Sequence, residues 1–211
     1  MSRDHILHRV RTSIGRSAGQ EPAPPPPVRL RIPKVPPDLR VTTFIMRLEA
    51  LAGNAQRVPT QAAARDLVAS AIAGKTAVAS NSPYLAECGI DTLPGVRSGI
   101  RDVNELRDAC EKADVGITSA DYALGDTGTL VMIASPAEAR LVSLLPPVHI
   151  AVVPCGRVLT GLDELFTILP LPAEQTSSMV LITGPSRTAD IEQILVCGVH
   201  GPGRISVLLV E

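Results

Sequence analysis

The fold class follows from the stretch Thr183-Gly184-Pro185-Ser186-Arg187-Thr188-Ala189-Asp190-Ile191-Glu192 and from Gly198-Val199-His200-Gly201-Pro202-Gly203 after it. Each of these Gly/Pro turns adjoins a short apolar run, residues 179–182 before the first and residues 205–210 after the second. Such alternation is typical of an α/β protein, in which strand ends carry functional groups onto loops at one edge of a sheet. Because the two loops hold ionisable residues as well as turn formers, the sequence predicts a functional site there.

Apolar runs and helical patterns alternate along the preceding chain. Short apolar runs predict strands at residues 57–58, 76–79, 114–118, 129–134 and 148–153. Apolar residues at helical spacing predict helices at residues 38–53, 61–73, 103–112 and 162–168. The run at 129–134 is continuous and rich in apolar residues, which indicates a central strand. The whole pattern predicts an α/β fold with a mostly parallel sheet flanked by helices.

The composition narrows the class of protein. Hydrophobic residues make up 45% of the 211 residues but aromatic residues only 2%, so the core is expected to consist of Val, Leu, Ile and Ala. Modules that stack nucleic-acid bases need aromatic platforms, so we expect no nucleic-acid partner. The four cysteines form no C-x-x-C pair, which predicts no metal or cluster in this chain. Neither a signal peptide nor a membrane span is visible, so we expect a reduced, cytoplasmic protein.

The N-terminal part differs from the rest. Residues 1–18 predict an amphipathic helix, residues 19–37 an extended Pro-rich linker and residues 38–211 the α/β domain. The first 37 residues carry a net charge of +5 and the remainder −6. A basic arm can touch nucleic acid, a membrane or an acidic partner, but a solvated helix is the favoured interpretation. We expect its apolar stripe to dock on its own body, on another subunit in a homo-oligomer, or on a partner protein.

The turn Gly125-Asp126-Thr127-Gly128-Thr129 precedes one of the expected strands. Asp-Thr-Gly is also the triplet of aspartic proteases, but that dyad needs two carboxylates and only one copy is present here. Two interpretations stay open. The turn is either a glycine turn whose Asp caps backbone amides, or a ligand loop that offers N–H groups to an anion.

Three further positions carry chemistry. Arg140 can bind a carboxylate or phosphate with two parallel hydrogen bonds. His149 opens an expected core strand, where a histidine is more often structural than catalytic. Gly184 begins a glycine loop that we expect to lead into a helix bearing Asp190 and Glu192. The N–H groups at the start of such a helix can bind an anion. The competing interpretation is an N-capped helix with acidic residues in its first turns and no ligand.

The residues also resemble a known family. Four ordered segments carry the resemblance: residues 118–130 (TSADYALGDTGTL), 138–150 (EARLVSLLPPVHI), 184–192 (GPSRTADIE) and 198–202 (GVHGP). Together they resemble the LUD-domain family, specifically its lactate utilization protein C branch, over residues 38–211. The resemblance implies a fold related to the sugar-phosphate isomerase and CoA-transferase-like superfamily. It also implies a role in oxidising L-lactate to pyruvate beside iron–sulfur partner proteins, with no cluster in this chain.

These considerations lead to one functional hypothesis and two alternatives. We expect an accessory or substrate-handling subunit of a lactate-oxidising system, with a small organic anion as ligand. The alternatives are a stand-alone isomerase or acyl/CoA-transferase-like enzyme, with Glu192 or Asp126 as base or nucleophile, and a non-catalytic assembly protein. The candidates for proton transfer are Asp126, Asp190, Glu192 and His200. The candidates for substrate binding are Thr127, Gly128, Thr129, Arg140, His149, Gly184, Ser186 and Thr188. We expect their loops to converge on one cleft.

Overall fold

The computed structural model describes residues 2–17, 19–20, 32–189 and 195–211. It separates into two units, residues 1–31 and 32–211. The first unit contains helix α1 (Arg3–Ser13), whose first turn is capped by Ser2 Oγ accepting the N–H of His5. Ile6, Val10 and Ile14 are about half exposed in this unit.

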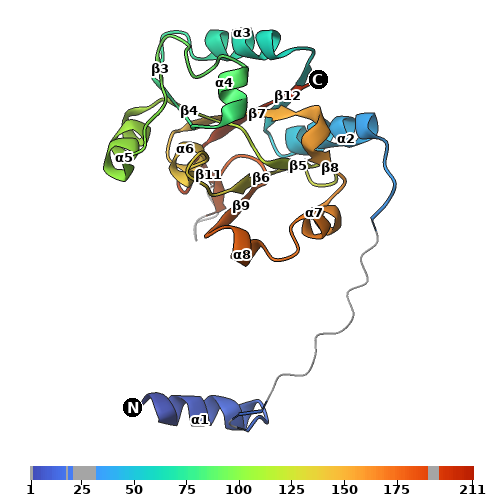
Figure 1. Cartoon of the computed structure of the whole chain (residues 1–211), viewed down its shortest axis with the longest axis vertical. Coiled ribbons are helices and arrows are strands. Elements are labelled where there is room, and N and C mark those ends of the chain that lie inside the picture. The colour runs from blue at the N-terminus through green and yellow to red at the C-terminus, as the bar shows by residue number, and fades with distance from the viewer. Residues whose placement is uncertain (1, 18, 21–31, 190–194) are drawn as a thin grey trace. The chain divides into compact units, whose positions relative to one another are not determined.

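A six-stranded parallel sheet forms the centre of the second unit (Figure 1). Its order is β1-β12-β7-β4-β2-β3, and every pair of neighbouring strands is parallel. The strands are β1 (Asn54–Val58), β2 (Ala77–Ala79), β3 (Val96–Arg97), β4 (Val115–Thr118), β7 (Val148–Pro154) and β12 (Arg204–Val210). All six therefore end at the same carboxyl edge.

Helices cover both faces of this sheet. On one face, α3 (Gln61–Ala71) and α4 (Pro83–Glu87) bury Val68 and Leu85 against alternate strand residues such as Ile117. The opposite face holds α2 (Pro37–Ala50), α5 (Val103–Lys112) and α6 (Arg140–Leu144). Burial on both faces explains why the central strands read as continuous apolar runs.

A second, four-stranded sheet of order β8-β5-β6-β9 packs on the α2 face of the parallel sheet. It consists of β5 (Tyr122–Leu124), β6 (Thr129–Ile133), β8 (Val158–Leu159) and β9 (Met179–Ile182). Leu130 and Met132 of β6 face the parallel sheet, whereas Val131 faces α7 (Leu162–Ile168). The short helices η1 (Cys155–Arg157) and α8 (Pro172–Gln175) complete the connections.

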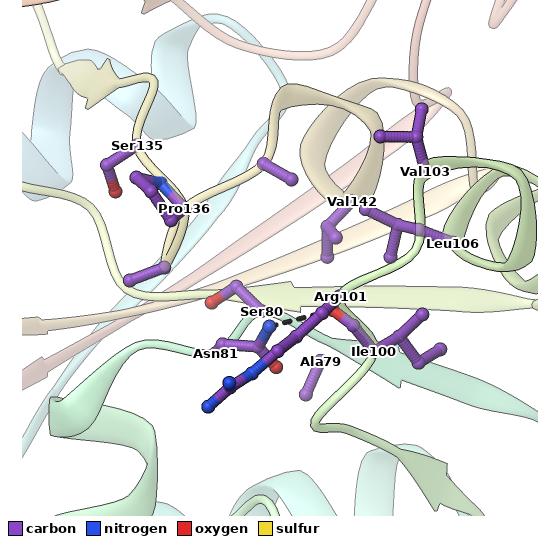
Figure 2. A pocket seen from close by; sticks show the side chains of 12 residues that line it. Ala79, Ser80, Asn81, Ile100, Arg101, Val103, Leu106, Ser135, Pro136 and Val142 are labelled. Carbon is purple, nitrogen blue, oxygen red and sulfur yellow. Dashed lines mark hydrogen bonds between the residues drawn. The ribbon is translucent and has the colours of Figure 1, made fainter.

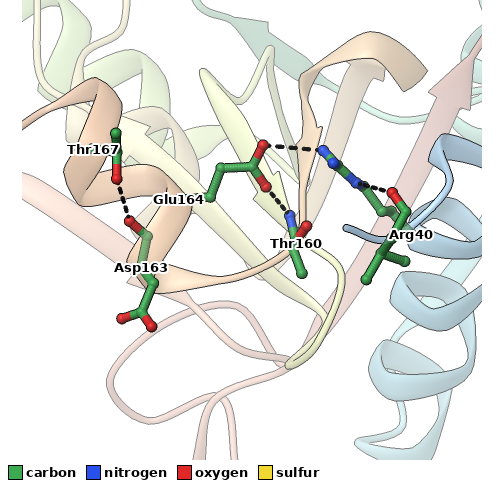
Figure 3. Close-up of polar contacts among 6 residues, drawn as sticks. Arg40, Thr160, Asp163, Glu164 and Thr167 are labelled. Carbon is green, nitrogen blue, oxygen red and sulfur yellow. Dashed lines mark hydrogen bonds and ion pairs between the residues drawn. The ribbon is translucent and has the colours of Figure 1, made fainter. Parts of the chain in front are cut away.

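A half-buried ion pair joins α2 to α7 (Figure 3). Arg40 Nη1 lies 3.1 Å from Glu164 Oε1, and Arg40 Nε donates to the carbonyl of Val35 at 2.9 Å. The other carboxylate oxygen of Glu164 accepts the N–H of Thr160 at 2.7 Å. These contacts help to fix the second sheet between the two helices.

The expected fold class, α/β with a mostly parallel sheet flanked by helices, is confirmed. Two details of the expectation are wrong. Residues 129–133 and 179–182 pair antiparallel with each other in the second sheet instead of joining the parallel one. The glycine loop is not followed directly by a helix: residues 187–189 form strand β10 (Arg187–Ala189), paired antiparallel with β11 (Leu195–Cys197). Asp190 and Glu192, which the expected helix bears, lie outside the described residues.

Candidate functional site

Polar residues gather where β2 and β4 end, at the carboxyl edge of the parallel sheet. Ser80, Asn81 and Ser82 follow β2, and Ser119 and Asp121 follow β4. Adjacent parallel strands place such residues side by side, and ligands of open α/β sheets bind at this edge. The loop after β6, residues 134–139, arrives at the same place, because Glu138 contacts Ser119 there.

Two cavities open on this edge. The larger has a volume of about 560 Å³ and the smaller about 270 Å³. Ser80, Asn81 and Arg101 line both of them. In Figure 2, Ser80, Asn81 and Arg101 lie with Ala79 and Ile100 in the lower part of the view, and Val103, Leu106 and Val142 lie above them to the right.

Asn81 fixes the loop that carries Arg101. Its Nδ2 donates to the carbonyl of Ile100 at 2.8 Å, and its Oδ1 accepts the N–H of Gly99 at 2.8 Å. The Arg101 side chain is exposed at the mouth of both cavities, and among the described residues no carboxylate pairs with it. A planar guanidinium in this position suits a ligand carboxylate, which it can bind through two hydrogen bonds.

Glu138 lies behind the wall of these cavities and is only 7% exposed. Its Oε1 accepts the N–H of Ser119 at 3.0 Å. Its backbone is held in a tight turn, because Glu138 N–H donates to Ser135 Oγ at 3.0 Å and Ser135 N–H donates to the Glu138 carbonyl. The chain therefore places this carboxyl between β2 and β4 by main-chain contacts.

Burial dominates the electrostatics of Glu138. Desolvation raises the pKa of this carboxyl to about 7, although the N–H of Ser119 and the hydroxyls of Ser80 and Ser82 lower it. A pKa near 7 suits a group that gives up or takes up a proton at neutral pH. Within the described part of the chain, Glu138 Oε2, Ser80 Oγ and Ser119 Oγ are buried without an aligned hydrogen-bond partner.

A second carboxylate stands close to Glu138. Asp121 Oδ2 accepts the N–H of Ile133 at 2.7 Å, which ties the end of β6 to the end of β4. Desolvation raises the pKa of Asp121, opposed by that N–H and by the charge of Arg157. The negative charge of Asp121 in turn helps to raise the pKa of Glu138.

His149 is fully buried inside β7, facing the second sheet. Its Nε2 lies 2.8 Å from Thr118 Oγ1, which also approaches Met132 Sδ. Desolvation lowers the pKa of this imidazole to about 4, so the ring is neutral at physiological pH. Neither cavity includes His149 in its lining.

The turn at residues 125–129 packs against α2. A Cβ added at Gly128 would lie 2.5 Å from Leu48 N, and one at Gly125 would lie 2.9 Å from the Arg40 carbonyl. Both glycines are thus required for close approach of two backbones, which supports the glycine-turn interpretation. Asp126 and Thr127 are exposed on the outer side of this turn.

The loops around Gly184 and His200 adjoin each other at the amino edge of the parallel sheet. Ser186 N–H donates to the Pro202 carbonyl at 2.9 Å, and Gly203 N–H donates to the carbonyl of Pro147, just before β7. Gly184 contacts Leu51 after α2, and His200 is exposed. The backbone of Thr188 belongs to β10, whereas Asp190 and Glu192 lie outside the described residues.

The predicted site residues thus fall into two groups rather than one cleft. Thr129 Oγ1 links to Thr127 Oγ1 and to Thr183 Oγ1, each at 2.8 Å, which connects the turn at Asp126 with the Gly184 loop. Arg140 lies beyond the opposite end of β6 and donates to Ser178 Oγ at 3.4 Å. β6 has five residues with a rise of ~3.3 Å per residue, and its length separates Arg140 from the turn at Asp126.

Sequence reasoning misses the residues of the carboxyl-edge cavities. One feature of the sequence could have indicated them: the polar triplet Ser80-Asn81-Ser82 directly follows an apolar run. Ligand sites of α/β proteins often lie at such strand ends. Arg101 carries no signal in the sequence. Glu138 opens the resembling segment 138–150, but its place beside Ser119 depends on contacts between distant segments.

The parallel sheet with helices on both faces places the chain in the broad class of open-sheet α/β proteins, in which ligand sites lie at the carboxyl edge. Within that class, the chain belongs to the LUD domain family, whose sequence model matches residues 41–210. A solved structure agrees in fold: a DUF162 family protein from Deinococcus radiodurans has a TM-score of 0.63 at 19% identity, covering 84% of this chain and 99% of that one.

Sequence relatives point in the same direction. A lactate utilization protein C from Halalkalibacterium halodurans is 42% identical over 110 residues, which cover 50% of this chain and 48% of that protein. Another, from Geobacillus kaustophilus, is 31% identical over 155 residues, covering 67% of this chain and 65% of that protein. The chain therefore spans about half to two thirds of the length of these relatives.

Proposed function

We propose that this chain takes part in lactate utilization as a substrate-handling subunit that binds a small organic acid at the carboxyl-edge cavities. The names of its sequence relatives support the pathway. The observation that carries the binding role is Arg101, a guanidinium with no carboxylate partner in the described chain, which lines two cavities together with Ser80 and Asn81. The acid is a 2-hydroxy or 2-oxo carboxylate.

The rest of the lactate-oxidising chemistry belongs to partners in this proposal. Electron transfer takes place in iron–sulfur proteins of the same system, and this chain carries no metal or cluster of its own. Within the described residues, no group of three or more His, Cys, Asp or Glu side chains is placed to hold a metal ion. Likewise, no described helix is both long and apolar enough to cross a membrane.

The loops at the amino edge have a separate role in this proposal. Thr127, Ser186 and His200 are partly or fully exposed there. Gly128 beside Thr127 packs against α2, Gly184 packs against Leu51 just after α2, and Gly201 beside His200 packs against Ser186. We assign this surface to contact with the partner proteins. Proton transfer by Asp126 or His200 remains a prediction, which alanine variants assayed within the assembled system would test.

Titration of L-lactate and pyruvate into the purified full chain, followed by calorimetry, tests the binding role. Arg101→Met should weaken binding at least tenfold, because it removes a charge-assisted hydrogen-bonded pair. Arg107→Met, an exposed arginine on α5 outside both cavities, is the matched control and should bind as the parent does. Equal binding by both variants would exclude Arg101 as the carboxylate anchor.

A second assay tests the pathway. Lactate-dependent dye reduction by the iron–sulfur partner proteins should increase when this chain is added, and Arg101→Met should reduce that increase. Turnover of sugar phosphates or CoA thioesters by the isolated chain would instead favour the stand-alone isomerase or acyl-transferase alternative.

A further inference from the structure

Three buried oxygen atoms at the carboxyl edge lack hydrogen-bond partners among the described residues. They are Ser80 Oγ, Ser119 Oγ and Glu138 Oε2, on residues that are 3%, 2% and 7% exposed. Buried polar atoms in folded proteins are nearly always hydrogen-bonded. The three residues adjoin, because Ser119 N–H donates to Glu138 Oε1 and the Ser80 hydroxyl acts on the Glu138 carboxyl. A ligand group or a bound water at this place would complete their hydrogen bonding.

Ser80 connects this cluster to the cavities. It lines both of them, and its hydroxyl is close enough to the Glu138 carboxyl to lower the pKa of that group. Glu138 itself is behind the wall and held by Ser119. Ser80 Oγ is itself covered in this structure, so a ligand oxygen reaches it only when the Ser80 side chain turns toward the cavities that the residue lines. Glu138 is reached only through Ser80.

We propose that Ser80 and Glu138 form the proton-exchanging part of this site, recognising an oxygen on the carbon next to the ligand carboxylate. Arg101, which lines the same two cavities, holds the carboxylate. The site thereby selects 2-oxo and 2-hydroxy acids over acids that lack this oxygen. This inference rests on the proposed function, since it assumes that the cavities bind an organic acid.

The proton positions follow from the groups involved. A 2-oxo acid offers only an acceptor, so Ser80 O–H donates to its carbonyl while protonated Glu138 donates to Ser80 Oγ. A 2-hydroxy acid can donate to Ser80 Oγ, and Ser80 then donates to ionised Glu138. When pyruvate binds to the form with ionised Glu138, the carboxylate takes up one proton from solvent; otherwise only hydrogen bonds form and break.

The pH dependence follows from the same scheme. The titratable or charged groups around Glu138 are Asp121 nearby and Arg157 beside Asp121; Ser80, Ser82 and the Ser119 N–H are its polar neighbours. A bound anion adds negative charge near Glu138 and favours its protonated form. Since that pKa is about 7, pyruvate affinity should fall about tenfold between pH 6 and pH 8, with proton uptake on binding.

Calorimetric titration with three acids of equal chain length tests the inference. Pyruvate and L-lactate carry the oxygen, whereas propionate does not. The parent chain should bind pyruvate about fivefold more tightly than propionate at pH 6.5, the gain from one net hydrogen bond. Ser80→Ala should abolish that preference, while Ser70→Ala, an exposed serine on α3, should keep it.

Glu138→Gln provides a second variant that keeps the shape of the carboxyl but cannot titrate. It should bind pyruvate with no pH dependence and with no proton uptake, measured in buffers of different ionisation enthalpy. Glu49→Gln, on the exposed side of α2, should retain both effects. Equal affinity of the parent for pyruvate and propionate, or unchanged proton uptake in Glu138→Gln, would overturn the inference alone. Failure to bind any of the three acids would overturn the proposed function, and the inference with it.

Discussion

Replacing Glu138 with glutamine should stabilise the protein at alkaline pH and leave it nearly unchanged in acid. Burial raises the pKa of this carboxyl from its ordinary 4.5 to about 7, so the folded state binds the proton more tightly than the unfolded state does. The stabilising contribution of that proton is complete below pH 4.5 and is lost as the pH rises through 7. Glutamine resembles the neutral carboxyl and does not undergo this loss.

The magnitude follows from the pKa difference. A shift of one pKa unit corresponds to about 1.4 kcal/mol, so a rise from 4.5 to about 7 costs the ionised protein ~3 kcal/mol. Most of this cost, roughly 2–3 kcal/mol, develops between pH 5 and pH 8.5. In a domain of this size it corresponds to a difference in Tm of roughly 5–10 °C.

Urea unfolding of the parent and the variant, followed by circular dichroism at pH 5 and pH 8.5, measures this difference directly. The quantity to compare is the change in the variant's advantage between the two pH values, because other titrating groups cancel in it. Glu49→Gln, an exposed carboxylate on α2, is the control and should show no such change. A variant advantage that is the same at both pH values would refute the argument that Glu138 is buried and partly neutral.

Three other predictions concern the fold and the N-terminal arm. In a histidine NMR titration, the His149 ring should remain neutral until the pH nears 4. The stability that its neutral form contributes should be lost as the pH falls from 6.5 to about 4. Ionisation of His149 near pH 6.5 would contradict its burial. Gly128→Ala should lower the free energy of unfolding by ~2 kcal/mol or more, because of its positive φ and its approach to α2, whereas Gly156→Ala, with open space around it, should change little. Deleting residues 1–37 should leave the cooperative unfolding of the α/β domain intact but weaken its association with other subunits or partner proteins, as light scattering would show. Loss of the cooperative unfolding transition, or unchanged association, would contradict a docking role for the arm.

The parallel sheet could be predicted from the sequence because its strands are buried on two sides. The apolar runs at residues 148–153 and 206–210 have this pattern and form β7 and β12. The run at 129–134 has the same pattern for another reason. Its strand, β6, pairs antiparallel with β9 but is covered by the parallel sheet on one face and by α7 on the other. Because both faces are buried, the sequence of β6 shows no alternation of polar and apolar residues that would indicate antiparallel pairing.

The carboxyl-edge site could be predicted only in part. A polar triplet after an apolar run marks Ser80. Glu138 opens one of the segments that resemble the LUD-domain family, but the residue pattern does not indicate that its side chain is buried beside Ser80. The chemistry of Glu138 depends on burial beneath a serine from β2 and on an N–H from Ser119, 19 residues away. The sequence motifs instead emphasise glycines at Gly128 and Gly184, whose observed contacts are with α2 and the residues directly after it.

The location of the bound acid is the most direct test of the account. Adding pyruvate and L-lactate to the ¹⁵N-labelled chain should shift the backbone amide signals of Ser80, Asn81, Gly99 and Arg101, which surround the two cavities at the carboxyl edge. The amides of Gly184 and His200, at the amino edge, should not move. Shifts confined to Gly184 and His200 would contradict the proposed site and would place binding at the loops that the sequence motifs favour.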